Sequence, residues 1–271
     1  MTSVEHDLDR LEGYYDGVPR AGARTEDFGP LTLFVREGAG WPFYARPTRG
    51  ATTAPVTADD VDRVRARQRE LGIPEAFEWV AEDTPGLRAA VEKSGLTVHE
   101  HPLMVLDPEA AAPEPHPSVR LLGADDPLLP AALAVPHLAF AAPGTAIGEA
   151  GPAELAAEIA ARADDGRTEH VAGRLRAGTT AVAAAVEDGV VLCSGTHNPL
   201  DGVTEIVGVG TLPTARRQGL GQAVTAALVA DARAGGIGTV FLSASDEDVA
   251  RIYARLGFRP VGTALIAEPA E

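Results

Sequence analysis

The chain has 271 residues, of which 45% are hydrophobic and 23% charged, and this balance excludes a chain that is disordered throughout. Asp and Glu outnumber Lys and Arg by 39 to 23, and the net charge of −16 argues against nucleic acid or an anionic membrane as the main partner, because phosphate binding needs dense basic patches. One cysteine, Cys193, excludes an internal disulfide framework and a multi-cysteine zinc site.

Two further patterns bear on location. The first residues, MTSVEHD, lack the basic and apolar regions of a secretory signal. No uninterrupted apolar run reaches the roughly 20 residues that span a bilayer. Together with the single cysteine, these patterns lead us to expect a cytoplasmic protein without membrane-spanning segments.

The N-terminal half ends in a helix–strand–helix–strand pattern. Apolar periodicity predicts helices at 59–71 and 87–93 around a strand at 76–82, and Gly95-Leu96 follows the second helix. The C-terminal half ends in the same way, with Gly257-Phe258 after its last helix. Aligning the two dipeptides superposes the elements within a couple of residues, so we predict a diverged internal duplication.

A proline-rich break separates the two halves. Its sequence, DPEAAAPEPHPS at residues 107–118, holds four prolines and no apolar periodicity. Proline lacks a backbone N–H and disfavours helix in the residue before it, so an extended linker is expected. We predict a domain at 1–107, a linker at 108–117 and a second domain at 118–271.

The C-terminal half alternates between strand and helix patterns, which indicates an α/β domain. Asp188-Gly189 predicts a hairpin, because both residues tolerate positive φ. Gly257 is expected to end the last helix in a left-handed conformation. The predicted strands are residues 118–122, 180–187, 190–195, 205–212 and 239–243, and the predicted helices are residues 128–140, 152–163, 222–234 and 247–256.

The segment GVGTLPTARRQGLG, residues 208–221, carries the chemistry. A strand runs into a proline, then into a loop and a helix. Free N–H groups at a helix start and the helix dipole form an anion site, and glycines let a ligand approach the backbone. Arg216 and Arg217 add positive charge, so a diphosphate is the natural occupant. The spacing fits neither a Walker A loop nor the dinucleotide pattern GxGxxG.

This segment resembles the acyl-CoA-binding loop of the GNAT N-acetyltransferase superfamily. The family pattern is Gln/Arg-x-x-Gly-x-Gly/Ala shortly after a proline that ends a strand, and here Arg216, Gly219 and Gly221 fill it, with Pro213 before them. A second match follows downstream, where ARIYARLGF at residues 250–258 resembles the family's Ala-x-x-x-Tyr-x-x-x-Gly-Phe signature.

The resemblance implies an α/β GNAT fold, a mixed twisted sheet flanked by helices whose fourth and fifth strands splay apart to admit the pantetheine arm. It covers residues 118–268 as a complete domain and residues 28–106 as a degenerate partial copy. That copy has Val91 in place of Tyr253, and the segment TTAPVTA before its first helix lacks the arginine and the glycines. It is not expected to acetylate anything, and lining the acceptor site, stabilising the fold and forming a homodimer all remain open as its role.

Acetyl transfer gives chemical roles to two residues. An amine must be neutral to attack a thioester, yet a free alkylamine has a pKa of roughly 10; a carboxylate can remove its proton, directly or through water. Glu205 matches the general-base glutamate of the superfamily's histone acetyltransferases; an exposed strand-end carboxylate, with a water chain as base, is the alternative. Tyr253 matches the family's general acid for the departing thiolate; a tyrosine packed on the core is the alternative.

The resemblance also implies which residues would hold acetyl-CoA, the expected cosubstrate. The strand backbone would bind the pantetheine arm through Val209, Gly210 and Thr211. The loop would bind the diphosphate through Arg216, Arg217, Gln218, Gly219, Leu220, Gly221 and Gln222. Asp246 stands where family members commonly have an asparagine that touches CoA. An ionised carboxylate cannot donate a hydrogen bond, so this contact is expected to be weak or lost.

We interpret the chain as a tandem GNAT-like N-acetyltransferase. It would move an acetyl group from acetyl-CoA to a small or peptide amine, by direct attack in a ternary complex and without a metal. A catalytically silent acyl-CoA-binding or sensing protein is one alternative, and an enzyme for a longer acyl-CoA is another. The sequence does not identify the acceptor amine.

Overall fold

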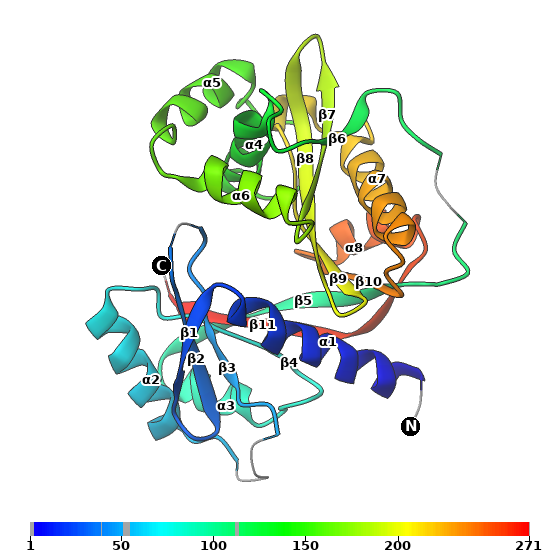
Figure 1. Cartoon of the computed structure of the whole chain (residues 1–271). Helices are drawn as coiled ribbons and strands as arrows, with labels where there is room; N and C mark the ends of the chain where they lie inside the picture. Colours follow the sequence, from blue (N-terminus) through cyan, green and yellow to red (C-terminus); the bar gives the residue numbers. More distant parts are fainter. Residues whose placement is uncertain (1–2, 39, 51–54, 112–113, 271) are drawn as a thin grey trace. The chain divides into compact units, whose positions relative to one another are not determined.

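The computed structural model describes residues 3–38, 40–50, 55–111 and 114–270, and the chain divides into two compact units (Figure 1). Unit 1 runs up to residue 104 and also includes residues 243–250 and the chain from residue 260 onward. Unit 2 comprises residues 105–242 and 251–259. Each unit has a sheet with helices, so the predicted α/β class is confirmed.

Unit 1 has a mixed sheet in the order β1-β2-β3-β4-β11-β5. The pairs β1–β2 and β2–β3 are antiparallel, β3–β4 is parallel, and β4–β11 is antiparallel. Its core cluster joins Phe77 and Trp79 of β4 to Val61 and Val64 of α2 and to Leu87 of α3. The elements are α1 (Ser3–Arg20), β1 (Ala23–Asp27), β2 (Leu31–Arg36), β3 (Ala45–Pro47), α2 (Ala58–Leu71), β4 (Phe77–Val80), α3 (Leu87–Lys93), β5 (Leu96–Leu106) and β11 (Phe258–Pro269).

Unit 2 repeats this arrangement with the sheet order β10-β9-β8-β7-β6. The pairs β7–β8 and β8–β9 are antiparallel and β9–β10 is parallel, as in the first four strands of unit 1. The elements are β6 (Val119–Leu122), α4 (Leu129–Ala141), α5 (Pro152–Ala161), α6 (Arg167–Arg176), β7 (Ala181–Glu187), β8 (Val190–Leu200), β9 (Val203–Thr211), the 3₁₀ turn η1 (Pro213–Ala215), α7 (Leu220–Ala234) and β10 (Thr239–Ser243). Helix α8 (Glu247–Ala254) has its first four residues in unit 1 and its last four in unit 2.

Helices α4 and α7 cover opposite faces of the unit 2 sheet (Figure 1). Ser194 of β8 donates its hydroxyl to the carbonyl of Ala132 in α4, at 2.6 Å. Its neighbour Gly195 faces the other way, since a Cβ there would meet side chains of α7 such as Leu228, at 3.3 Å. Successive strand residues point to opposite faces, so the two contacts place the helices on either side of β8.

The predicted duplication is confirmed in the order of its elements. The spacing that relates Gly95 to Gly257 also relates Val91 to Tyr253, and it relates Thr57, the N-cap of α2, to Gly219, the N-cap of α7. Part of the segment TTAPVTA, residues 52–54, lies outside the described residues.

The two copies differ at these helix starts. In α2 the backbone N–H and the hydroxyl of Thr57 donate to Asp60 at 2.8 and 2.6 Å, and the N–H of Asp60 donates to the Thr57 hydroxyl at 3.3 Å. This capping box fills the helix start with the chain's own carboxylate. An anion therefore has no place there, as the sequence predicts for the degenerate copy.

The division into units differs from the predicted domain boundaries, 1–107, 108–117 and 118–271. The last residues of the chain lie in unit 1, because β11 pairs there with β4, with Leu265 opposite Trp79. The beginning of the predicted linker is also held in place. Arg233 of α7 donates to the carbonyl oxygens of Asp107 and Ala110, at 3.3 and 3.0 Å.

A buried cluster of charges lies in unit 1. Arg46 of β3 is 1% exposed and donates a hydrogen bond to Glu12 of α1. Burial raises the pKa of Glu78 in β4 to about 7, against the opposing charge of Arg46. Burial also raises the pKa of Glu12, and Arg46 again opposes the rise. Burial therefore disfavours the ionised form of each carboxylate, and Arg46 favours it.

The Glu78 carboxyl predicts a pH-dependent stability. Its folded-state pKa lies above the ordinary value of about 4.3, so the folded state binds the proton more tightly and loses stability as the pH rises from about 4 to about 7. Glu78→Gln should raise the unfolding free energy at pH 8 by on the order of 1 kcal/mol, and by much less at pH 5. The thermal midpoint, measured at both pH values, should rise accordingly. The exposed Glu70→Gln is the control, and a shift from Glu78→Gln that is the same at both pH values would contradict the expectation.

Candidate functional site

Strand β9 has a neighbour on both sides for only part of its length. Its parallel pairing with β10 ends at Glu205, opposite Phe241. Its antiparallel pairing with β8 continues to Thr211, opposite Cys193. Among the described residues, the second half of β9 therefore has an open edge on the β10 side. The splayed pair of strands that the sequence resemblance implies is present between β9 and β10.

A β-bulge lies in this open half of β9. Ser194 is opposite Gly210, but Thr196 is opposite Val207, so β9 has one extra residue in this stretch. Gly208 has a φ of +64°, a left-handed conformation that glycine adopts without strain. The bulge re-aims the residues after it. Beyond it, Val209 faces α7, because it would meet a Cβ placed at Gly195.

The loop after β9 turns sharply into α7. The 3₁₀ turn Pro213–Ala215 follows the strand, and Arg217 and Gly219 have φ values of +68° and +80°. A left-handed arginine is strained, and such strain is retained where the surrounding structure enforces it, commonly at functional sites. The first turn of α7 lies close to the open strand, because a Cβ on Gly221 would be 3.7 Å from the Thr211 hydroxyl.

Unpartnered N–H groups converge at the start of α7. Among the described residues, no group accepts a hydrogen bond from the backbone N–H groups of residues 217–222. The N-cap is Gly219, which has no side chain to serve as a cap. These donors and the positive end of the helix dipole form an anion site beside the open edge of β9. Arg217 and Gln218 are exposed there, whereas Leu220 is buried.

The side chain of Arg216 binds the end of α4 and the segment after it, not the anion site. Its guanidinium donates to the carbonyl oxygens of Ala139 at 2.9 Å, Ala142 at 2.5 Å and Ala146 at 3.1 Å. These carbonyls lie at the end of α4 and in the segment that follows. Arg216 therefore ties the loop to α4, and Arg217 is the arginine of the pair whose side chain is exposed.

Tyr253 lies in unit 2 beside the open strand. Burial raises the pKa of its phenol well above the ordinary value, and a hydrogen bond with Thr225 of α7 opposes the rise. Thr225 in turn donates to the carbonyl of Gly221, at 2.9 Å. Cys193, which also interacts with the phenol, accepts a hydrogen bond from Thr211 at 3.2 Å. The ring of Tyr253 packs edge-on to Phe258, with centroids 6.1 Å apart.

The phenol is thus connected to the open strand through Thr211, Thr225 and Cys193. The sequence analysis did not assign Thr225 or Cys193 to the site. Burial raises the pKa of the Cys193 thiol to about 12, so it is protonated at neutral pH. Cys193 therefore has the character of a small buried residue rather than of a nucleophile.

Glu205 stands at the fork where β9 leaves β10. It is half-buried, with Asn198 opposite it in β8 and Phe241 opposite it in β10. Its neighbour Thr204 interacts with His197 at 3.0 Å on the α7 side of the sheet, so Glu205 faces the α4 side. Tyr253 approaches from the α7 side, and the two predicted catalytic residues therefore flank the fork from opposite faces.

Two other residues have structural partners. Asp246 accepts a hydrogen bond from the N–H of Val249 at 2.8 Å, so its carboxylate caps α8. His197 is buried, and its Nε2 lies 2.8 Å from a carboxylate oxygen of Asp231 in α7. His197 and Asn198 belong to β8, which continues to Leu200, beyond the strand predicted at 190–195.

Comparisons with known proteins agree with this geometry. Residues 153–258 match the model of the acetyltransferase (GNAT) family. None of the curated proteins matches the chain. A GCN5-related N-acetyltransferase from Kribbella flavida has a similar solved structure, with 23% identity and a TM-score of 0.63 over 99% of this chain and 96% of that one.

Two further solved structures are similar over most of the chain. A GCN5-related N-acetyltransferase-like protein from Streptococcus suis has 11% identity and a TM-score of 0.57, over 98% of this chain and 99% of that one. A tandem GNAT protein from the clavulanic acid biosynthesis pathway has 16% identity and a TM-score of 0.53, over 89% and 79%.

Residues 153–258 therefore form a domain of the acetyltransferase (GNAT) family, a family of acyltransferases. The GNAT fold extends over nearly the whole chain, and a tandem GNAT protein is among the solved structures that share it. The family supports acyl-CoA-dependent N-acyltransferase activity. Within the described part of the chain, no helix has the length and hydropathy to cross a membrane. The same residues include no cluster of three or more His, Cys, Asp or Glu side chains that could hold a metal ion.

The neighbouring arginines predict effects of different size on stability. Arg216→Met removes three charge-assisted hydrogen bonds and should cost about 1–3 kcal/mol of unfolding free energy. Arg217→Met, the matched control, removes an exposed side chain and should change the stability by less than about 0.5 kcal/mol. Chemical denaturation of both variants measures this difference, and equal losses would show that Arg216 does not tie the loop to α4.

Proposed function

We propose that the chain is an acetyl-CoA-dependent N-acetyltransferase that acts on an amine within a ternary complex. The observation that carries the proposal is the open edge of β9, which runs directly into a helix start with unpartnered N–H groups. Coenzyme A has the matching shape, because an extended arm with amide groups is joined to a diphosphate. A reducing, cytoplasmic location remains part of the proposal.

The loop would hold the diphosphate through its main chain. The N–H groups of residues 217–222 would donate to the phosphate oxygens, and Arg217 would add an exposed positive charge. Arg216 would contribute by fixing the loop and Asp246 by capping α8, without a side-chain contact to CoA. The resemblance implies that Arg216 and Asp246 contact CoA, and here we assign them structural roles instead.

The pantetheine arm would complete the open edge of β9. The backbone of Val209, Gly210 and Thr211 has no β10 partner, so it offers hydrogen bonds to the amides of the arm. Helix α4 lies close behind, since a Cβ on Gly210 would come within 2.9 Å of Pro136 and Ala139. At Gly210, β9 is therefore packed directly against α4.

The chemistry would take place at the fork. The neutral amine would attack the thioester carbonyl, and a backbone N–H of the bulged strand would stabilise the oxyanion. Collapse of the intermediate breaks the C–S bond, and Tyr253 would give its proton to the departing thiolate. Burial raises the pKa of Tyr253, so the phenol carries that proton at neutral pH. Glu205, on the opposite face, would accept the proton that the amine loses.

The pH profile tests the role of Glu205. Glu205→Gln should lower kcat/KM about 100-fold at pH 7, because the substrate amine is then almost entirely protonated. The loss should shrink as the pH approaches 10, where a neutral amine no longer needs a base. CoA-thiol release across an amine panel measures this, and parallel profiles for the variant and the parent would rule out the base role.

Tyr253→Phe is the matched variant in the same assay, since it removes the acid and leaves the base. Its kcat should fall about 100-fold at every pH while the affinity for CoA is kept. Unchanged turnover in both variants, or no CoA-thiol release with any amine, would favour a protein that binds acyl-CoA without catalysis.

A further inference from the structure

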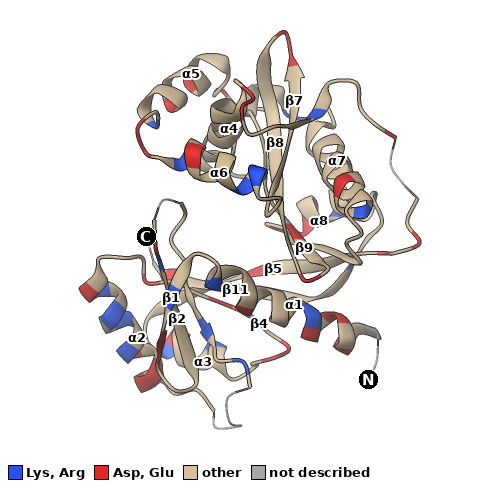
Figure 2. Cartoon of the chain, viewed as in Figure 1, with Lys and Arg blue, Asp and Glu red and all other residues tan. Residues whose placement is uncertain are grey.

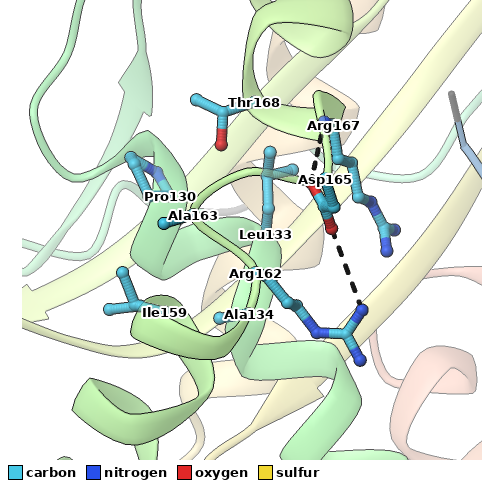
Figure 3. A pocket seen from close by; sticks show the side chains of 9 residues that line it. All are labelled: Pro130, Leu133, Ala134, Ile159, Arg162, Ala163, Asp165, Arg167 and Thr168. Carbon is cyan, nitrogen blue, oxygen red and sulfur yellow. Dashed lines mark hydrogen bonds and ion pairs between the residues drawn. The ribbon is translucent and has the colours of Figure 1, made fainter.

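A cavity of about 240 Å³ lies between α4, α5 and α6 of unit 2 (Figure 3). It is on the α4 side of the sheet, the side that Glu205 faces. Much of its wall is apolar and comes from Leu133 and Ala134 of α4 and from Ile159 of α5. The cavity therefore suits an apolar chain.

The polar part of the wall contains two arginines and one aspartate. Arg162 and Arg167 both line the cavity, together with Asp165 and the hydroxyl-bearing Thr168 (Figure 3). Asp165 accepts a hydrogen bond from the backbone N–H of Arg167 at 2.8 Å and lies 3.9 Å from the guanidinium of Arg162. Arg162 also pairs with Glu158.

Arg167 occupies a partly buried position near the cation Arg162 and beside the ring of His137. Its Nη1 lies 2.6 Å from Nε2 of His137 in α4, and since arginine only donates, the ring nitrogen accepts. The pKa of His137 is lowered by burial and by the charges of Arg162 and Arg167. Burial and the charge of Arg162 also lower the pKa of Arg167, with Asp165 opposing. A further negative charge in the cavity would offset these costs.

Helix α6 connects this cavity to the fork in the sheet. Arg174, two turns after Arg167, donates to the side-chain oxygen of Asn198 at 2.9 Å. Asn198 is the register partner of Glu205. Seven residues of helix span about 10 Å, which is the distance along α6 between the Cα atoms of Arg167 and Arg174. The basic residues of α6 are visible in Figure 2, although the chain as a whole has a net charge of −16.

We propose that this cavity binds the far end of the acceptor, and that the acceptor is an amine carrying a carboxylate beyond an apolar segment. The carboxylate lies between the guanidinium groups of Arg167 and Arg162, and the apolar segment lies along Leu133 and Ile159. The amine then reaches toward Glu205 from the α4 face. This inference rests on the proposed N-acetyltransferase function for its catalytic part, but the carboxylate site stands on the cavity alone.

The wild-type chain gives the first test. Initial rates of acetylation are compared for aminobutyrate, aminohexanoate and aminooctanoate, each with the amine at the far end, and for butylamine, hexylamine and octylamine. We expect the longer amino acids to have kcat/KM at least about tenfold above the matched alkylamines. A ratio near one for all three pairs would overturn the proposal.

Variants on α6 give the second test. Arg167→Met should reduce the ratio for aminooctanoate over octylamine to below about threefold. Arg176→Met is the matched control, because Arg176 is on the same helix, is exposed and pairs with Asp125 and Glu169 away from the cavity. The control should keep the ratio of the parent, and a loss of the same size in both variants would overturn the proposal.

Calorimetric titration with octanoate, which has no amine, separates this inference from the proposed function. Octanoate should bind the full chain, with an affinity at least about tenfold lower in Arg167→Met and unchanged in Arg176→Met. If octanoate binds in this way but no amine is acetylated, the carboxylate site stands and the proposed function fails. If amines are acetylated without preference and octanoate does not bind, the carboxylate site alone is overturned.

Discussion

The site depends on the incomplete pairing of one strand. Strand β9 keeps β8 as a neighbour to its end but loses β10 after Glu205, so that, in the described part of the chain, its backbone groups on the β10 side have no strand partner there. Buried or half-buried backbone groups need hydrogen-bond partners, so an open strand edge next to a helix start can bind a ligand that supplies them. The bulge, the tight loop and the contact of Gly221 with Thr211 all serve to bring these two sets of groups together.

The duplicated halves show what the open helix start requires. Both α2 and α7 follow a parallel-paired strand, and their N-caps correspond in the repeat. Thr57 and Asp60 close the start of α2 with their own hydrogen bonds, whereas Gly219 leaves the start of α7 open. The same fold thus occurs twice in this chain. In the first copy a carboxylate fills the anion site at the helix start, and in the second copy that site is available to a ligand.

Much of this architecture could be predicted from the sequence, because local signals determine it. The hairpin at Asp188-Gly189, the loop before α7 and the order of the repeated elements are short-range patterns. Helix α6 was missed, since its sequence RTEHVAGRLR is mostly polar and Ala172 is its buried residue. The role of Arg216 could not be read either, because its partners lie some seventy residues earlier in the chain. Pairing of β11 with β4 is a similar long-range contact that no periodicity reveals.

The most direct test compares the affinities of coenzyme A and pantetheine for the full chain by calorimetric titration. Pantetheine carries the arm and the thiol but no diphosphate. If the main chain at the start of α7 grips the diphosphate, coenzyme A should bind at least about 100-fold more tightly, and the difference should shrink as salt is added. Equal affinities for the two molecules, or no binding of coenzyme A, would contradict the account.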